Sequence, residues 1–216
     1  MEDILQTIVA HKRREVALHI AHTPLETMRA RAEAVDRPTV SMSRALKASS
    51  TGIIAEFKRR SPSKGWIARY AHPSDVAAAY ERSGATAMSI LTDGEFFGGG
   101  VSDLTAARAV TTLPLLRKEF IVHEYQIYEA RAAGADAVLL IASVLTPEEC
   151  RHLTDTAHAL GLETLLEIHS ADEIGHILPD TDMIGVNNRH LGTFHTDTEV
   201  SFTMADKLPH DRVLVS

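Results

Sequence analysis

The sequence IIAEFKRRSPSKG, residues 53–65, places an apolar run directly before two charged side chains and a turn. Residues two apart share one face of a strand, so Glu56 and Lys58 should point the same way, with Phe57 on the opposite face. In the turn that follows, Ser61 and the backbone N–H groups around it could hold a small anion. The stretch predicts an acid and a base side by side at a strand end. The alternative is a solvated ion pair.

Apolar runs of similar length recur along the whole chain, separated by stretches with helical spacing. The predicted strands are 52–58, 87–91, 113–117, 137–141, 164–167, 183–187 and 212–215. The predicted helices between them are 73–82, 101–110, 124–132, 147–160 and 171–178. This strict alternation predicts a parallel sheet, either open and doubly wound or closed as a (β/α)₈ barrel.

Polar side chains at the ends of several predicted strands favour the α/β barrel (TIM barrel). They close five of the seven runs: Glu56 and Lys58, Asp93, Arg117 and Lys118, Glu167, and Asn187 and Asn188. An open sheet instead concentrates its ligand at one switch point, and no Gly-x-Gly-x-x-Gly follows the first strand.

The predicted domain is a single one, 1–216, in which 1–48 form an N-terminal helical extension. Seven strands are visible where a barrel has eight, and the seventh ends at Val215-Ser216. We therefore expect the last one and a half β/α units to lie outside this sequence.

Composition narrows the classes of function. The 216 residues are 44% hydrophobic, enough for a sizeable core, and the net charge of −7 disfavours non-specific binding to nucleic acid. A small anionic metabolite fits better. One cysteine excludes an internal disulfide, the start of the chain lacks a signal-peptide pattern, and no apolar run is long enough for a membrane helix. We expect a cytoplasmic protein that binds no membrane.

Two strand-end residues are the leading candidates for acid–base chemistry. Crowding of Lys118 by Arg117 and Lys58 would lower the pKa of its ammonium and suit it to act as a general acid. Apolar flanks would raise the pKa of Glu167. The alternative for Lys118 is an ordinary surface lysine, and the alternative for Glu167 is a structural ion pair with a neighbouring lysine.

Other motifs add binding groups. Asn187-Asn188-Arg189 offers amides and a guanidinium for a carboxylate, phosphate or hydroxyl, unless it is only a turn. Phe96-Phe97-Gly98-Gly99-Gly100 predicts a flexible loop whose aromatic rings could close over a ligand. The 12 histidines match no metal-binding pattern, so no metal is inferred, and Cys150 is interpreted as structural.

Taken together, these motifs resemble indole-3-glycerol-phosphate synthase of tryptophan biosynthesis. The resemblance rests on IAEFKRRSPSKG at 54–65, LTD at 91–93 with FFGG at 96–99, LRKEFI at 116–121, YQIYEARAAGAD at 125–136, ETLLEIH at 163–169 and IGVNNR at 184–189. Where that family usually has Lys-Asp-Phe, this chain has Lys118-Glu119-Phe120.

The resemblance implies a cofactor-free (β/α)₈ lyase whose extra N-terminal helices cover the barrel floor. Its phosphosugar substrate, 1-(2-carboxyphenylamino)-1-deoxyribulose 5-phosphate, would close to indole-3-glycerol phosphate with loss of CO₂ and water. Association with other tryptophan-pathway enzymes is a further expectation of this kind. The family sequence would continue past Ser216 into Glu-Ser-Gly and a further strand with a Gly-rich turn, which supply much of the phosphate site.

The resemblance also implies a role for each candidate residue. Lys118 would protonate the ketone oxygen as the aromatic ring attacks, and Glu167 would transfer a proton during dehydration. Lys58 would contact the departing carboxylate or assist later proton steps, Glu56 would orient it, and Asn187 would bind substrate hydroxyls or the carboxylate. The substrate-binding residues would be Phe97 and Phe120 against the anthranilate ring, and Ser61 and Arg189 at polar groups.

Two other functions fit parts of the pattern. Phosphoribosylanthranilate isomerase, another phosphosugar barrel, would use a cysteine and an aspartate as its acid–base pair, but Cys150 closes no predicted strand. A non-catalytic binding or assembly module, which gains its last strands from a partner chain, is the other alternative.

Overall fold

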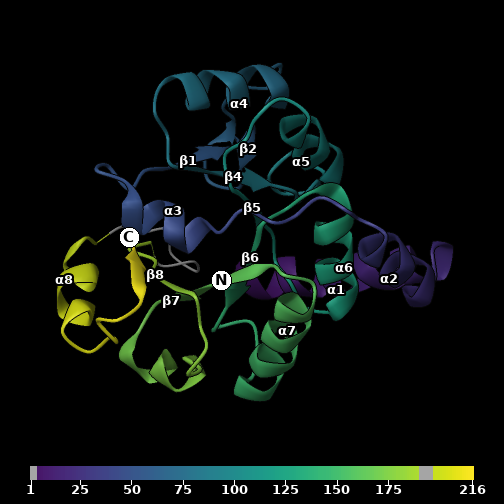
Figure 1. Cartoon of the computed structure of the whole chain (residues 1–216). Helices are drawn as coiled ribbons and strands as arrows, with labels where there is room; N and C mark the ends of the chain where they lie inside the picture. Colours follow the sequence, from purple (N-terminus) through teal and green to yellow (C-terminus); the bar gives the residue numbers. More distant parts are fainter. Residues whose placement is uncertain (1–3, 190–196) are drawn as a thin grey trace.

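The computed structural model describes residues 4–189 and 197–216. The principal strands are β1 (Ile54–Phe57), β4 (Ala87–Leu91), β5 (Leu115–Lys118), β6 (Ala137–Ile141), β7 (Glu163–Ile168), β8 (Met183–Val186) and β9 (Val213–Val215). They form one parallel sheet in chain order, and each of the seven predicted strands is confirmed. The sheet curls around a common centre (Figure 1).

Helices follow the strands and pack outside the curled sheet. They are α4 (Pro73–Arg82), α5 (Val101–Arg108), α6 (Glu124–Ala133), α7 (Pro147–Ala159) and α8 (Glu199–Ala205), with a 3₁₀ helix, η1 (Ala171–His176), after β7. The prediction of an ordinary helix over 171–178 is wrong. Gly175 has a low helix propensity and Pro179 cannot continue a helix, so only a short 3₁₀ turn forms there.

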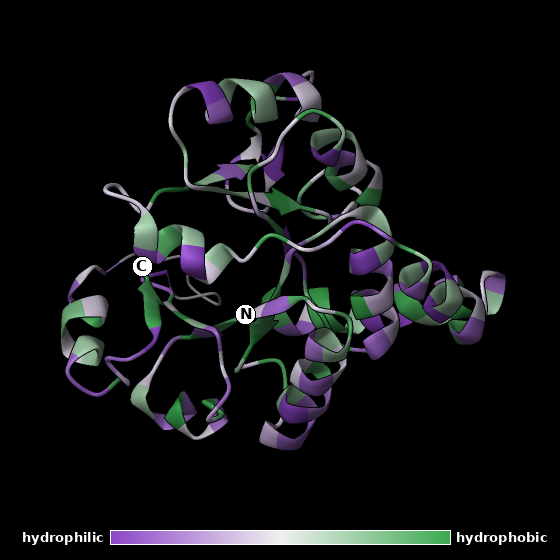
Figure 2. Ribbon diagram, viewed as in Figure 1, coloured by the Kyte–Doolittle hydropathy of each residue, from purple (hydrophilic) through white to green (hydrophobic). Residues whose placement is uncertain are grey.

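Alternating side chains along the strands build two separate cores. One set points outward and packs against the helices, as Ile90, Leu140 and Ile184 do. The other set points inward and fills the centre of the curl, as Leu139 and Met183 do. In Figure 2 the strands are accordingly dominated by hydrophobic residues, whereas the helices mix both kinds. Two buried faces explain why the strands read as continuous apolar runs.

Three N-terminal helices, α1 (Ile4–His22), α2 (Leu25–Glu33) and α3 (Met42–Ala48), precede β1. α3 lies at the amino-terminal end of the sheet, where Ser49 at its C-terminus bonds Thr86 just before β4 (Oγ–Oγ1 2.7 Å). α1 lies at the opposite, carboxyl end of the sheet. Its Lys12 pairs there with Asp93 and Glu119, which follow the ends of β4 and β5. The prediction that the N-terminal helices cover the floor is therefore wrong for α1.

A backbone hydrogen bond joins the segment after β4, where a flexible loop was predicted, to the loop after β1. The loop after β1 forms a short hairpin of β2 (Arg60–Ser61) and β3 (Gly65–Trp66). The Arg60 backbone N–H donates to the Phe97 carbonyl. A Cβ at Gly99 would lie 2.1 Å from the Leu91 carbonyl oxygen, so this glycine serves close backbone approach rather than mobility.

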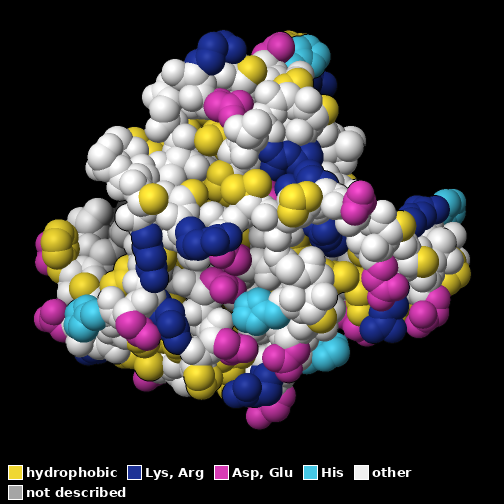
Figure 3. All heavy atoms as spheres, in the orientation of Figure 1, with side chains coloured by type: hydrophobic (Ala, Val, Ile, Leu, Met, Phe, Trp, Pro, Cys, Tyr) yellow, Lys and Arg dark blue, Asp and Glu magenta, His cyan; other side chains and the backbone are white. Residues whose placement is uncertain are grey.

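On the face that Figure 3 shows, the positively charged Lys and Arg side chains and the negatively charged Asp and Glu side chains are interspersed, so no large patch carries a single sign of charge. Within the described ranges, 4–189 and 197–216, no helix is long and apolar enough to cross a membrane.

Candidate active site

A cavity of about 440 Å³ opens at the carboxyl ends of the strands. Its apolar wall comes from inward-facing strand residues, Ile54, Leu116, Leu165 and Val215. Its polar residues are Glu56, Ser89, Lys118, Glu167, Asn187, Asn188, Arg189 and Ser216. Parallel strands bring their last side chains to one edge, so residues more than 100 positions apart meet here.

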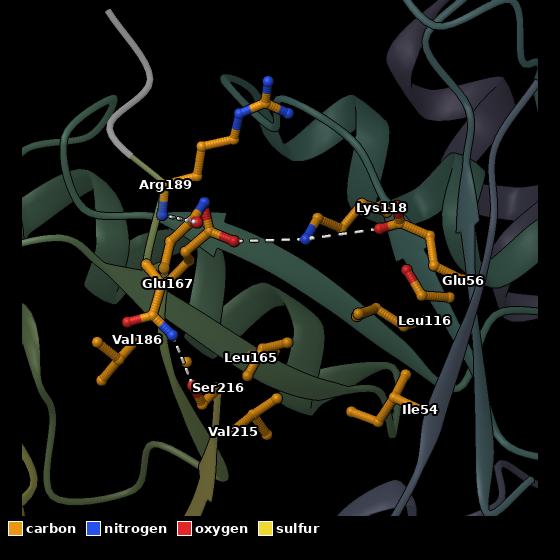
Figure 4. Close-up of a pocket in the computed structure, with 14 residues that line it drawn as sticks. Ile54, Glu56, Leu116, Lys118, Leu165, Glu167, Val186, Arg189, Val215 and Ser216 are labelled. Atoms are coloured by element: carbon orange, nitrogen blue, oxygen red, sulfur yellow. Dashed lines mark hydrogen bonds and ion pairs between the residues drawn. The ribbon is translucent and has the colours of Figure 1, made fainter. Parts of the chain in front are cut away.

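Lys118, the last residue of β5, lies between two carboxylates from different strands (Figure 4). Its Nζ is 3.4 Å from Glu167 Oε2 on β7 and 4.0 Å from Glu56 Oε2 on β1. The lysine thus crosses the mouth of the cavity and joins the two sides of the curl.

Glu56 and Lys58 share a face, as predicted from the strand period. Lys58 Nζ donates to Glu56 Oε1 at 2.6 Å, while Phe57 is buried on the outer face of the sheet. Each carboxylate oxygen of Glu56 therefore faces a lysine ammonium, Oε1 that of Lys58 and Oε2 that of Lys118. Both side chains of the Glu56–Lys58 pair are about one-third exposed, so a bound substrate could reach them.

The predicted pKa directions at Lys118 and Glu167 are both wrong. Burial alone lowers the pKa of Lys118, but the carboxylates of Glu167 and Glu56 outweigh it and raise this pKa above its ordinary value. Arg117 does not crowd Lys118, because successive strand residues point to opposite faces, and its guanidinium donates to Glu129 on α6 (2.6 Å).

Burial alone raises the pKa of Glu167, but the Lys118 ammonium, the Asn187 amide and His169 lower it below its ordinary value. At neutral pH the pair is therefore an ammonium and a carboxylate.

Asn187 and Arg189 extend this polar row beyond β8. Asn187 Nδ2 donates to Glu167 Oε1 at 3.0 Å, and the Arg189 backbone N–H donates to Asn187 Oδ1 at 2.9 Å. The Arg189 guanidinium points away from the Lys118–Glu167 pair (Figure 4) and donates to Ser63 Oγ on the loop after β1. This bond links the loop after β1 to the segment after β8.

Three predicted binding residues lie outside the cavity wall. The Ser61 hydroxyl is buried in the hairpin after β1 and accepts from the Lys64 backbone N–H. Phe97 and Phe120 contact each other, with ring centroids 6.0 Å apart, but do not line the cavity.

Two residues that the sequence-based prediction did not include lie at the site. Ser89 on β4, opposite Glu56, has a buried hydroxyl with no hydrogen-bond partner among the described residues. His169 Nε2 lies 3.6 Å from Glu167 Oε1. The alternation of side chains along a strand could have identified both residues. Ser89 lies opposite Glu56 and shares its inward face, and His169 is two residues after Glu167, which puts it on the same face.

The arrangement suits acid–base chemistry on a molecule with an apolar ring and anionic groups. The cavity offers the Lys118 ammonium, the carboxylates of Glu56 and Glu167 and the Asn187 amide beside an apolar wall, and a second ammonium, that of Lys58, pairs with Glu56. Cys150 lies in α7, and burial, together with nearby Glu149, raises the pKa of its thiol to about 11, which does not suit the cysteine–aspartate pair of the isomerase. Among the residues that the structure describes, no cluster of potential metal ligands occurs.

The family model described as "Indole-3-glycerol phosphate synthase" matches residues 5–216. The chain belongs to the indole-3-glycerol phosphate synthase family. An indole-3-glycerol phosphate synthase from Bacteroides thetaiotaomicron is 53% identical over 216 residues, covering 100% of this chain and 83% of the relative. One from Burkholderia cenocepacia is 46% identical over 219 residues, covering 100% and 84%.

Among solved structures, tryptophan synthase subunit alpha from Legionella pneumophila aligns with a TM-score of 0.48 and 13% identity, over 67% of this chain and 66% of its own. The assignment to the indole-3-glycerol phosphate synthase family rests on the sequence matches, which extend through the strands that carry Glu56, Lys118 and Glu167.

Proposed function

We propose that the cavity at the carboxyl ends of the strands closes 1-(2-carboxyphenylamino)-1-deoxyribulose 5-phosphate to indole-3-glycerol phosphate. The ring carbon that bears the carboxylate forms a bond to the ketone carbon, CO₂ leaves and restores the aromatic ring, and the former ketone oxygen leaves as water. The reaction is balanced without an oxidant or reductant. The Lys118 ammonium between Glu56 and Glu167 is the observation that carries this proposal.

Lys118 acts as the general acid at the ketone oxygen. Its raised pKa keeps the proton on the ammonium at neutral pH, so the acid is ready when substrate binds. The ketone oxygen becomes an alkoxide as the carbon–carbon bond forms, and an alkoxide is basic enough to take a proton from such an ammonium. The proton therefore moves only as charge develops in the transition state.

The groups beside Lys118 serve the other steps. Lys58 is close enough to Glu56 to be oriented by it and presents a cation for the departing carboxylate. Glu167 is a carboxylate at neutral pH and accepts a proton during dehydration. Asn187, which holds Glu167 Oε1, contributes its remaining amide donor to substrate oxygens.

Four further residues were predicted to bind substrate. The contact of Phe97 and Phe120 with the anthranilate ring stays a prediction, because the two rings contact each other but neither lines the cavity. Arg189, which lines the cavity, holds a polar group of the phosphosugar, and its bond to Ser63 joins the loop after β1 to the segment after β8. The same role for Ser61 stays a prediction, because its hydroxyl is buried in the hairpin after β1.

The test is a direct assay of both products. Incubation with the carboxyphenylamino substrate should yield indole-3-glycerol phosphate and CO₂ in equal amounts, in the presence of a metal chelator. Phosphoribosylanthranilate, the isomerase substrate, should remain unchanged. Isomerisation of that second substrate, or CO₂ release without indole formation, would contradict the proposal.

We also propose that an eighth parallel strand closes the sheet between β9 and β1, giving a (β/α)₈ barrel. Within the described residues, β1 and β9 are the edge strands of the sheet, and each is paired with a neighbouring strand on one side only. Both edges line one hollow of about 440 Å³, together with Leu46 of α3. Ile53, directly before β1, and Leu214 in β9 are 54% and 39% exposed at this seam, whereas the central strands β4 and β6 are buried throughout.

The closure proposal predicts a large gain in stability on adding a strand. We would compare the 216-residue chain with one extended by about 40 residues that supply a further β/α unit. Covering the seam should raise Tm by about 5 °C or more and reduce edge-to-edge association in sedimentation. An unchanged Tm and an already monomeric 216-residue chain would show that no strand belongs between β9 and β1.

A further inference from the structure

A lysine lies in the middle of the buried stripe of α1. Leu5, Ile8, Val9 and Val16 form that stripe at helical spacing, and Lys12 occupies the position between them where the pattern calls for an apolar side chain. Its side chain is 1% exposed. A buried ammonium is costly unless carboxylates pair with it, so its presence calls for a partner.

Lys12 meets that requirement with two buried carboxylates from neighbouring strand ends. Its Nζ lies 3.0 Å from Asp93 Oδ2 and 3.2 Å from Glu119 Oε1, and also 2.9 Å from Glu15 Oε1 on α1 itself. Burial lowers the pKa of Lys12, but the carboxylates outweigh it and raise the pKa above its ordinary value. The lysine is thus a permanent charge that joins α1 to the segments after β4 and β5.

The same carboxylates hold the backbone of those two segments. Asp93 Oδ1 accepts from the backbone N–H groups of Phe96 (2.7 Å) and Phe97 (3.2 Å). Glu119 Oε1 accepts from the Phe120 backbone N–H at 2.9 Å. The ammonium therefore fixes two side chains, and each of them fixes a stretch of main chain.

Those stretches carry groups of the candidate site. Glu119 is the residue directly after Lys118, and Phe97 and Phe120 are in contact with each other. Without Lys12, the buried Asp93 would have no cation partner among the described residues. The one cation still near Glu119 there would be Arg117, at 3.9 Å, beside the hydrogen bond that the Thr92 hydroxyl donates to Glu119. Two like charges left in that space would repel each other or draw in water, and would move the main chain that they hold.

We propose that Lys12 is a positioning residue, which acts through Asp93 and Glu119 to fix the segments after β4 and β5 in the geometry that the site requires. Its effect on turnover rests on the proposed function, whereas its effect on the backbone does not. The rival interpretation is a simple anchor, in which the lysine only attaches α1 to the sheet.

The test compares Lys12→Met with Arg13→Met, an exposed position next to it on the same helix. Amide hydrogen exchange at Phe96, Phe97 and Phe120 should be about tenfold faster or more in Lys12→Met and unchanged in Arg13→Met. Turnover should fall about tenfold or more, with KM changed less than about threefold, because a displaced Lys118 affects the chemical step.

A second variant covers the case in which Lys12→Met does not fold. Lys12→Met with Glu119→Gln removes one positive and one negative charge, and the new amide oxygen can still accept from Phe120. Compared with the unaltered chain, amide exchange in this double variant should be faster at Phe96 and Phe97, whose N–H groups bond Asp93, but unchanged at Phe120.

Each outcome decides between the two interpretations. A folded Lys12 variant with a lower Tm but normal amide protection and normal turnover would leave only an anchor and overturn the inference. If the unaltered chain formed no indole-3-glycerol phosphate, the proposed function would fail, while the exchange experiment, which needs no substrate, would still test Lys12.

Discussion

Lys118→Ala should lower kcat by about 100-fold or more, because it removes the only ammonium that lies between Glu56 and Glu167 in the described structure. The ketone oxygen would then have to take its proton from water. Initial rates of indole-3-glycerol phosphate formation, measured over a range of substrate concentrations, separate this effect from a change in KM. A general acid that acts in the transition state should affect kcat more than KM.

Lys207→Ala is the matched control for that experiment, because Lys207 is exposed and follows α8, away from the cavity. Its kcat should stay within about twofold of the unaltered chain. Lys118→Ala should still fold, since Lys118 lies at the open end of the sheet, and a melting curve checks this. Near-normal turnover in folded Lys118→Ala would remove this lysine from the mechanism.

The second large effect should separate two glutamates at opposite ends of the sheet. Glu56→Gln keeps the shape of the side chain but removes the charge that Lys58 and Lys118 both face. We expect kcat/KM to fall by about tenfold or more, with little change in Tm, because the residue is one-third exposed.

Glu163→Gln should show the reverse pattern. Glu163 begins β7 at the amino-terminal end and accepts from the Ser43 backbone N–H (2.8 Å) and hydroxyl (2.8 Å) in α3. Losing this charge-assisted bonding costs about 1–2 kcal/mol, which corresponds to a Tm lower by about 2–8 °C. Its kcat/KM should stay within about twofold. Equal kinetic effects in the two variants would mean that the strand direction or register is wrong.

Much of the fold could be predicted from local sequence, because strand and helix patterns are short-range. The helix predicted over 147–160 is α7, and a local capping box fixes its start: Thr146 Oγ1 accepts from the Glu149 backbone N–H, and Glu149 Oε2 accepts from the Thr146 backbone N–H. The period of two in a strand likewise predicts that Glu56 and Lys58 share a face. Such features depend on residues within a few positions of one another.

What only the tertiary structure decided are the interactions between distant segments. The raised pKa of Lys118 depends on Glu167, 49 residues away, and on Glu56, so no window of sequence around 118 could predict its direction. In the sequence, Lys12 is a charge in an apolar helical stripe with no evident partner. Only the fold brings Asp93 and Glu119 close enough to pair with it. Charge–charge energies depend on distance and burial in space, and neither follows from position along the chain.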